Sequence, residues 1–134
     1  MNQARILIAD DDSDLRLALS VRLRANNFDT VCAVDGYSAL ALALQERPDL
    51  IILDLGLPAG DGFAFLKKVK EYPALSSIPI IVLTGSNSRD DKKRSLESGA
   101  VAFLQKPHTD AELMRVIRTS LQRAWGSLPA LAAV

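Results

Sequence analysis

The sequence predicts an α/β fold, a doubly wound five-stranded parallel sheet with helices on both faces. Five short apolar runs alternate along the chain with segments of helical periodicity. The runs are continuously apolar rather than alternating, which is typical of parallel strands that are buried on both sides. Strand–helix alternation of this kind, connected by right-handed crossovers, places helices on both faces of one sheet.

A strand and a helix open the chain. The strand is the apolar run from Ile6 to Ala9, which is followed by three consecutive aspartates. Asp12 or Ser13 is a suitable N-cap for the helix, and Asn26-Asn27 is a suitable stop. The inner face of this helix is predicted from apolar residues at helical spacing, which are Leu15, Ala18, Leu19 and Leu23.

The second and third strands follow in the middle of the chain. Residues Phe28–Val34 form the second strand, and Asp35-Gly36 turns into an Ala/Leu-rich helix that ends near Arg47-Pro48. The helix ends there because the residue before a proline disfavours the helical conformation. Leu50–Asp54 is the third strand, and the segment after it, residues 55–62, is too rich in Gly and Pro to be regular.

Two more strands and three more helices complete the series. A helix from Phe63 to Tyr72 closes before a proline and is followed by a strand, Ile78–Thr84. A polar helix, Arg89–Ser98, is stopped by Gly99, and Val101–Gln105 is the fifth strand. The last helix is predicted from a capping-box pattern and an inner apolar face, which are Thr109-Asp110-Ala111-Glu112 and then Leu113, Val116, Ile117 and Leu121.

The length of the chain and its balance of charges limit the class of protein that it can be. One domain is expected over residues 1–126, with a short C-terminal tail at 127–134, because 134 residues are enough to bury a core. Sixteen Lys+Arg balance sixteen Asp+Glu, so no broad basic field indicates nucleic acid or an anionic membrane as a partner. The single cysteine, Cys32, is expected as a buried strand thiol. The chain shows no signal-peptide pattern and no apolar run of membrane-spanning length, and these features together predict a cytoplasmic protein.

Polar residues stand where four of the predicted strands end. They are Asp10 and Asp11 after the first strand, Asp54 at the third, Thr84 at the fourth and Lys106 after the fifth. The carboxyl ends of parallel strands share one edge of the sheet, and open α/β sheets place their ligands there. We therefore expect these five side chains to meet in one crevice.

The predicted crevice has the groups needed for phosphoryl chemistry. Several carboxylates in one place repel each other unless a hard cation shares them, and Mg²⁺ suits such oxygen ligands, with a backbone carbonyl from the loop Leu55-Gly56 added. We expect Asp54 to be the nucleophile, because it ends the central strand and leads into a flexible loop. The Lys106 ammonium and the Thr84 hydroxyl would contact the other phosphoryl oxygens, where charge builds during transfer.

Other residues of similar type are expected to have ordinary structural roles. Asp12 is expected as a helix cap. The spacing Asp10-x-Asp12-x-Asp14 superficially resembles a calcium loop, but the glycine and glutamate that such a loop requires fall on Leu15 and Val21. His108 is the only histidine and stands beside a proline, which is more typical of a surface residue than of a ligand.

Four motifs occur in a fixed order at the ends of the strands. They are Ile8-Ala9-Asp10-Asp11, Leu53-Asp54-Leu55-Gly56-Leu57-Pro58 with Asp61-Gly62 after it, Val82-Leu83-Thr84-Gly85, and Phe103-Leu104-Gln105-Lys106-Pro107. Over about residues 4–124 the chain resembles the receiver domain of two-component response regulators. This resemblance implies the flavodoxin-like strand order 2-1-3-4-5.

The resemblance also implies a phosphorylation-controlled signalling switch. Asp54 would accept a phosphoryl group from a histidine kinase or a histidine phosphotransfer protein. The residues that would hold Mg²⁺ are Asp10, Asp11, Asp54 and Gly56, the last through its backbone carbonyl. Lys106 would contact the phosphoryl group, Thr84 would move toward it on activation, and Phe103 would change rotamer with Thr84.

The output of such a switch is implied in the same way. A downstream protein partner would bind the face formed by the predicted helix 89–98, the strand 101–105 and the last helix. No nucleic acid or membrane is expected as a partner of this domain. The domain would catalyse only its own phosphorylation and dephosphorylation, so it is not expected to be an enzyme. One departure is His108, where the family often has phenylalanine at a corner that contacts partners.

Two alternatives remain open from the sequence. A haloacid-dehalogenase-like phosphatase would use the aspartates after the first strand together with a Thr or Ser and a Lys. Such an enzyme also needs an acidic motif at the end of a late strand, whereas Asp110 and Glu112 fall at the start of a helix. A receiver-like scaffold would bind partners without being phosphorylated.

Overall fold

Five parallel strands form one sheet in the order β2-β1-β3-β4-β5, as expected. The computed structural model describes residues 3–57, 62–85 and 88–126, and the strand count refers to these ranges. The strands are β1 (Arg5–Ala9), β2 (Asp29–Ala33), β3 (Leu50–Leu53), β4 (Ile80–Thr84) and β5 (Ala102–Gln105). Every neighbouring pair runs parallel, so all five carboxyl ends lie at one edge of the sheet.

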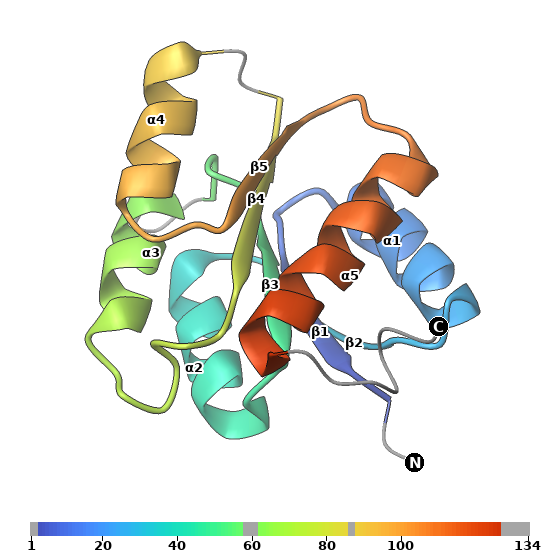
Figure 1. Cartoon of the computed structure of the whole chain (residues 1–134), viewed down its shortest axis with the longest axis horizontal. Coiled ribbons are helices and arrows are strands. Elements are labelled where there is room, and N and C mark those ends of the chain that lie inside the picture. Colours follow the sequence, from blue (N-terminus) through green and yellow to red (C-terminus); the bar gives the residue numbers. More distant parts are fainter. Residues whose placement is uncertain (1–2, 58–61, 86–87, 127–134) are drawn as a thin grey trace.

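Five helices cover the two faces of this sheet within the same ranges. They are α1 (Ser13–Ala25), α2 (Gly36–Glu46), α3 (Gly62–Lys70), α4 (Arg89–Glu97) and α5 (Asp110–Trp125). Figure 1 shows α1 and α5 on one side of the sheet and α2, α3 and α4 on the other. The doubly wound arrangement predicted from the sequence is therefore confirmed.

The alternation of side chains along the central strands produces two separate cores. Leu7 and Ile51 belong to the core beneath α2 and α3, whereas Ile6 and Leu50 belong to the core beneath α1 and α5. All four of these side chains are fully buried. Strands β1, β3 and β4 need apolar residues at nearly every position because helices cover both of their faces.

The prediction that the cysteine is buried is wrong, because β2 is an edge strand. Cys32 is exposed rather than buried. Strand β2 has only one neighbour in the sheet, and the Cys32 thiol lies at its margin, 3.5 Å from the Ser20 hydroxyl of α1. An apolar run therefore does not guarantee burial when the strand stands at an edge.

Helix α1 begins and ends where its caps predict, but one expected inner residue is wrong. Asp12 is the N-cap, and its carboxylate accepts hydrogen bonds from the backbone N–H groups of Asp14 and Leu15. The helix ends at Ala25, before two asparagines. Ala18 is exposed, because α1 packs on the sheet along Leu19 and Leu23 and a residue one position away points about 100° off that line.

Helix α4 is attached to the rest of the fold by few buried side chains. Of its residues only Ser95 is buried, and the Ser95 hydroxyl donates a hydrogen bond to the backbone oxygen of Asp91. The Arg94 guanidinium lies over the ring of Phe63 in α3, 3.9 Å from the ring centroid. Gly99 ends this segment with a φ of +110°, a conformation that favours glycine.

The other element ends differ from the predicted ones by one or two residues. Strand β4 starts at Ile80 rather than Ile78, since Pro79 has no N–H to contribute to the sheet. The motif residues Pro58 and Asp61 and the tail 127–134 lie outside the described residues. No helix within the described ranges has both the length and the apolar character needed to cross a membrane.

Candidate functional site

Three aspartates meet at the carboxyl ends of β1 and β3. The two strands are neighbours, and the backbone N–H of Asp54 donates to the carbonyl oxygen of Ala9 at 2.9 Å. This pairing places Asp54 beside Asp10 and Asp11, and one carboxylate oxygen from each lies within 4.8 Å of the others. We call Asp10, Asp11 and Asp54 the acidic cluster. Three hard oxygen donors this close fit a divalent cation such as Mg²⁺.

Asp10 is the buried member of the acidic cluster. Its side chain is 5% exposed, yet both carboxylate oxygens have partners. Oδ1 accepts from the backbone N–H of Asp12 at 2.9 Å, and Oδ2 accepts from Lys106 Nζ at 3.1 Å. Burial raises the pKa of Asp10, and this effect outweighs the two hydrogen bonds, which lower the pKa.

Lys106 follows β5, the edge strand opposite β2, and its side chain reaches the acidic cluster. Its backbone N–H donates to the carbonyl oxygen of Thr84 at 2.8 Å, so the end of β5 is tied to the end of β4. Its ammonium nitrogen lies 3.1 Å from Asp10 Oδ2 and 3.9 Å from Asp54 Oδ2. One positive charge therefore stands between two of the three carboxylates.

Asp54 lies in a half-open position that a reactant could approach. Its side chain is 14% exposed, and Oδ1 accepts a hydrogen bond from the backbone N–H of Gly56 at 3.2 Å. A Cβ built on Gly56 would lie 3.8 Å from both carboxylate oxygens, which is ordinary contact. The missing side chain of Gly56 therefore leaves this face of the carboxylate uncovered.

Thr84 and Phe103 lie on neighbouring strands behind the acidic cluster. Thr84 is buried at the last position of β4. Phe103 on β5 is partly buried, pairs in register with Val82 of β4, and packs against the core beneath α2 and α3. Thr84 itself pairs in register with Gln105, which follows Phe103 by two residues on β5.

One side chain at the acidic cluster was not predicted from the sequence. Arg16 of α1 donates from Nη1 to the backbone oxygen of Asp10 at 2.8 Å. Its position one turn after the N-cap Asp12 is a usable signal, because side chains in a helix lean toward its N-terminus.

His108 also differs from its expected surface position, since it is half-buried and its Nδ1 is enclosed without a hydrogen-bond partner among the described residues.

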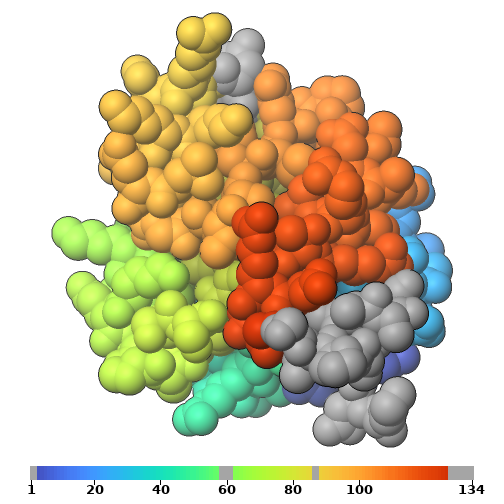
Figure 2. All heavy atoms as spheres, viewed as in Figure 1, coloured from blue at the N-terminus to red at the C-terminus, as the bar shows by residue number. Residues whose placement is uncertain are grey.

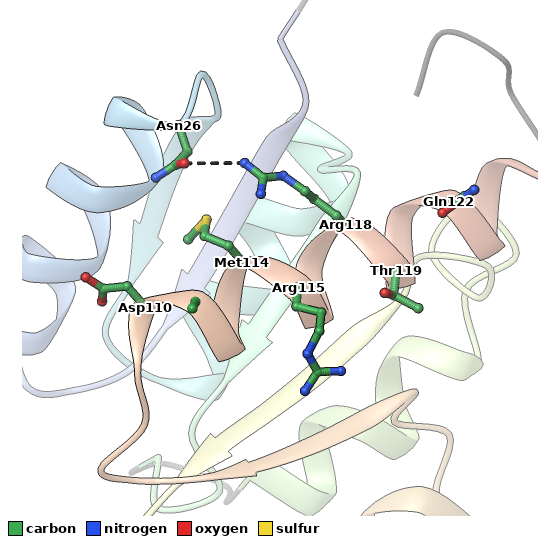
Figure 3. Close-up of a pocket in the computed structure, with 8 residues that line it drawn as sticks. Asn26, Asp110, Met114, Arg115, Arg118, Thr119 and Gln122 are labelled. Atoms are coloured by element: carbon green, nitrogen blue, oxygen red, sulfur yellow. Dashed lines mark hydrogen bonds between the residues drawn. The ribbon is translucent and has the colours of Figure 1, made fainter. Parts of the chain in front are cut away.

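A groove on another part of the surface is separate from the acidic cluster. It lies between the end of α1 and helix α5 and has a volume of about 530 Å³. Figure 3 shows Met114, Arg115 and Arg118 of α5 in this groove, with a 3.3 Å hydrogen bond from Arg118 to Asn26, the C-cap residue of α1. None of the site residues predicted from the sequence lines it.

The chain resembles response regulators in sequence. A family model described as the response regulator receiver domain matches residues 6–118. The response regulator PleD of Caulobacter vibrioides is 40% identical over 117 residues, which cover 87% of this chain and 26% of PleD. The transcriptional regulatory protein PrrA of Mycobacterium tuberculosis is 38% identical over 119 residues, which cover 89% of this chain and 50% of PrrA. The chain thus spans from about a quarter to half of the length of these relatives.

Solved structures give the same result. A putative response regulator from Chloroflexus aurantiacus matches with a TM-score of 0.87 and 31% identity, covering 91% of this chain and 100% of that one. The Vibrio cholerae chemotaxis protein CheY4 matches with a TM-score of 0.84 and 31% identity, covering 89% and 99%. The receiver domain of sensor histidine kinase PA1611 from Pseudomonas aeruginosa, which has a magnesium ion in its active site cleft, matches with a TM-score of 0.81 and 29% identity, covering 94% and 100%. The chain belongs to the response regulator receiver domain family.

Proposed function

We propose that this chain is a switch controlled by phosphorylation of Asp54, with a histidine kinase or a histidine phosphotransfer protein as the donor. The observation that carries the proposal is the acidic cluster with the Lys106 ammonium between Asp10 and Asp54. Membership of the receiver family supports the same chemistry. The phosphatase alternative has no such support, because the family matched is one of signalling switches rather than of hydrolases.

The acidic cluster has the composition of a Mg²⁺ site. Asp10, Asp11, Asp54 and the backbone carbonyl of Gly56 are the proposed ligands, and Asp11 is exposed, so water can complete the coordination. Lys106 offsets one of the three negative charges and leaves an excess that favours a divalent cation. When bound, Mg²⁺ would neutralise charge on the phosphoryl oxygens.

Asp54 is the proposed nucleophile because its carboxylate is the accessible one beside Lys106. One of its oxygens forms the new bond to phosphorus while the bond to the histidine nitrogen of the donor breaks, and that nitrogen keeps the electron pair. Lys106 then pairs with a phosphoryl oxygen. The Thr84 hydroxyl, at the end of the adjacent strand, supplies a further hydrogen bond.

The added charge provides the switching force. A phosphoryl group brings roughly −1.5 to −2 charges, which draw Thr84 and Lys106 inward and move Phe103 on β5. The proposed output surface is α4-β5-α5, where a downstream protein partner binds. Figure 2 shows α4 (yellow) and the segment from β5 through α5 (orange to red) on one face of the molecule. Two exposed apolar side chains in this region, Leu96 and Val101, suit a protein contact.

Incubation with a small phosphodonor tests the proposed function. In the presence of Mg²⁺ the protein should gain one phosphoryl group that is stable to acid and labile to base, as an acyl phosphate is. Chelation of the metal should prevent the gain. Intact-mass spectrometry measures both results. No phosphorylation under either condition would favour the scaffold alternative, in which the domain binds partners without chemical modification.

Mg²⁺ should stabilise the fold, because it relieves repulsion within the acidic cluster. The expected gain is RT ln(1 + [Mg²⁺]/Kd), or about 2.7 kcal/mol when the free metal is 100 times Kd. Asp11→Asn should raise the metal-free melting temperature and shrink the shift caused by Mg²⁺. Asp14→Asn, at another exposed position nearby, is the control and should leave that shift unchanged. Equal shifts in the wild type and Asp11→Asn, measured by thermal unfolding, would place the metal elsewhere.

A further inference from the structure

Arg16 holds a backbone group of the acidic cluster rather than a carboxylate. Arg16 lies one turn after the N-cap of α1, and its backbone N–H donates to the backbone oxygen of that N-cap, Asp12, at 3.0 Å. Its half-buried side chain runs back along the helix, and Nη1 donates to the backbone oxygen of Asp10 at 2.8 Å. A guanidinium hydrogen bond of this length is a good charge-assisted one.

With this contact, every polar group of Asp10 has a partner. The backbone N–H donates to the oxygen of Ala33 at 3.1 Å. The two carboxylate oxygens accept from Asp12 and Lys106, and the carbonyl oxygen accepts from Arg16. The other three partners hold the backbone N–H and the carboxylate, whereas Arg16 fixes the peptide group that continues to Asp11.

The peptide plane connects this hydrogen bond to the metal site. The carbonyl of Asp10 and the N–H of Asp11 belong to one rigid plane, so fixing the carbonyl fixes the direction in which the chain enters Asp11. Within the described residues, no hydrogen bond or ion pair holds the exposed Asp11 carboxylate, and its position therefore depends on its backbone. We propose that Arg16 is a positioning residue that orients the Asp10–Asp11 peptide and so raises the affinity of the acidic cluster for Mg²⁺. This inference rests on the proposed function of the cluster.

The charge of Arg16 acts against this effect, so the two contributions must be weighed. A cation beside the cluster repels Mg²⁺, and its removal would tighten binding. That repulsion is screened by salt and by water at the open side of the crevice. Loss of a group that orients metal ligands typically weakens affinity 10- to 100-fold. Orientation is therefore the larger effect, and the net result of removing Arg16 is weaker binding.

Three variants separate orientation from charge. Arg16→Met removes the hydrogen bond and the charge but keeps an apolar stem. Arg16→Lys keeps the charge and a donor. Arg24→Met removes another arginine of α1, one that hydrogen-bonds Thr30 rather than the cluster, and serves as the control. The Kd for Mg²⁺ is measured by amide NMR titration of the unphosphorylated protein at constant ionic strength, with thermal unfolding in chelator to establish that each variant is folded.

The expected result is about tenfold weaker Mg²⁺ binding in Arg16→Met, substantial recovery in Arg16→Lys and wild-type binding in Arg24→Met. If Arg16→Met is unfolded, Arg16→Gln is measured in its place, because glutamine also lacks the positive charge and is shorter than arginine. The same loss of Mg²⁺ affinity is expected. Binding as tight as wild type, or tighter, in the variant without the guanidinium would overturn the role of Arg16 while leaving the metal site in place. Absence of Mg²⁺ binding in the wild type would overturn both this role and the proposed function.

Discussion

Asp54→Asn should gain no phosphoryl group when it is incubated with Mg²⁺ and a small phosphodonor, whereas the wild type gains one. An amide at this position is a far weaker nucleophile than a carboxylate and cannot form the acyl phosphate. The substitution should leave the fold intact, because it removes one of three mutually repelling charges and keeps a side chain of the same size. Intact-mass spectrometry over a time course measures the difference.

The matched control for this experiment is Asp12→Asn. Asp12 is close in sequence to the acidic cluster, but its carboxylate caps α1, and asparagine is an equally good N-cap. Asp12→Asn should therefore be phosphorylated as the wild type is. Phosphorylation of Asp54→Asn to the wild-type extent would show that another residue is the acceptor and would remove Asp54 from the proposed role.

Gly62→Ala should destabilise the protein by roughly 1–3 kcal/mol, the usual cost of overpacking a tight site. Gly62 starts α3, and helix propensity alone would favour alanine by about 1 kcal/mol. The opposite result is expected because a Cβ at this position would stand 2.6 Å from the Cα of Leu55 and 3.0 Å from the backbone oxygen of Asp54. These are backbone atoms, which cannot rotate away as the end of a flexible side chain can.

The same substitution at Gly85 separates steric crowding from the loss of a glycine near the site. A Cβ on Gly85, the residue after Thr84, meets nothing within 4 Å. Gly85→Ala should therefore keep wild-type stability in urea unfolding and its normal rate of phosphorylation. Gly62→Ala should also be phosphorylated more slowly, because relieving the clash displaces the backbone that carries Asp54. Equal stabilities for the two variants would mean that the loop yields without cost.

The fold could be predicted from the sequence because its central strands carry an unambiguous pattern. Strands β1, β3 and β4 are buried on both faces, so their apolar runs and the polar residues that end them are visible locally. Cys32 shows the limit of this reasoning. Its run looks like the others, but its exposure depends on the position of β2 at the sheet edge, which is a property of the whole topology.

The acidic cluster was predicted more fully than its surroundings. Parallel strands must bring their carboxyl ends together, and this rule places Asp10, Asp11 and Asp54 correctly. The sequence does not distinguish Asp10 from Asp11, although the first is buried and the second exposed. The position of Arg16 one turn after the N-cap indicates that its side chain leans toward the cluster, but its hydrogen-bond partner depends on how far that side chain reaches.

Helix α4 packs on the rest of the fold through few buried side chains, so it should open more readily than the other elements. One buried residue in α4 compares with five in α5, so opening α4 exposes little apolar surface to water and costs little free energy. Backbone amides of α4 should therefore exchange their hydrogens with solvent sooner than those of α5 or the central strands. The lower this cost is, the smaller the bias that a phosphoryl group on Asp54 would have to supply in order to shift α4 between its states.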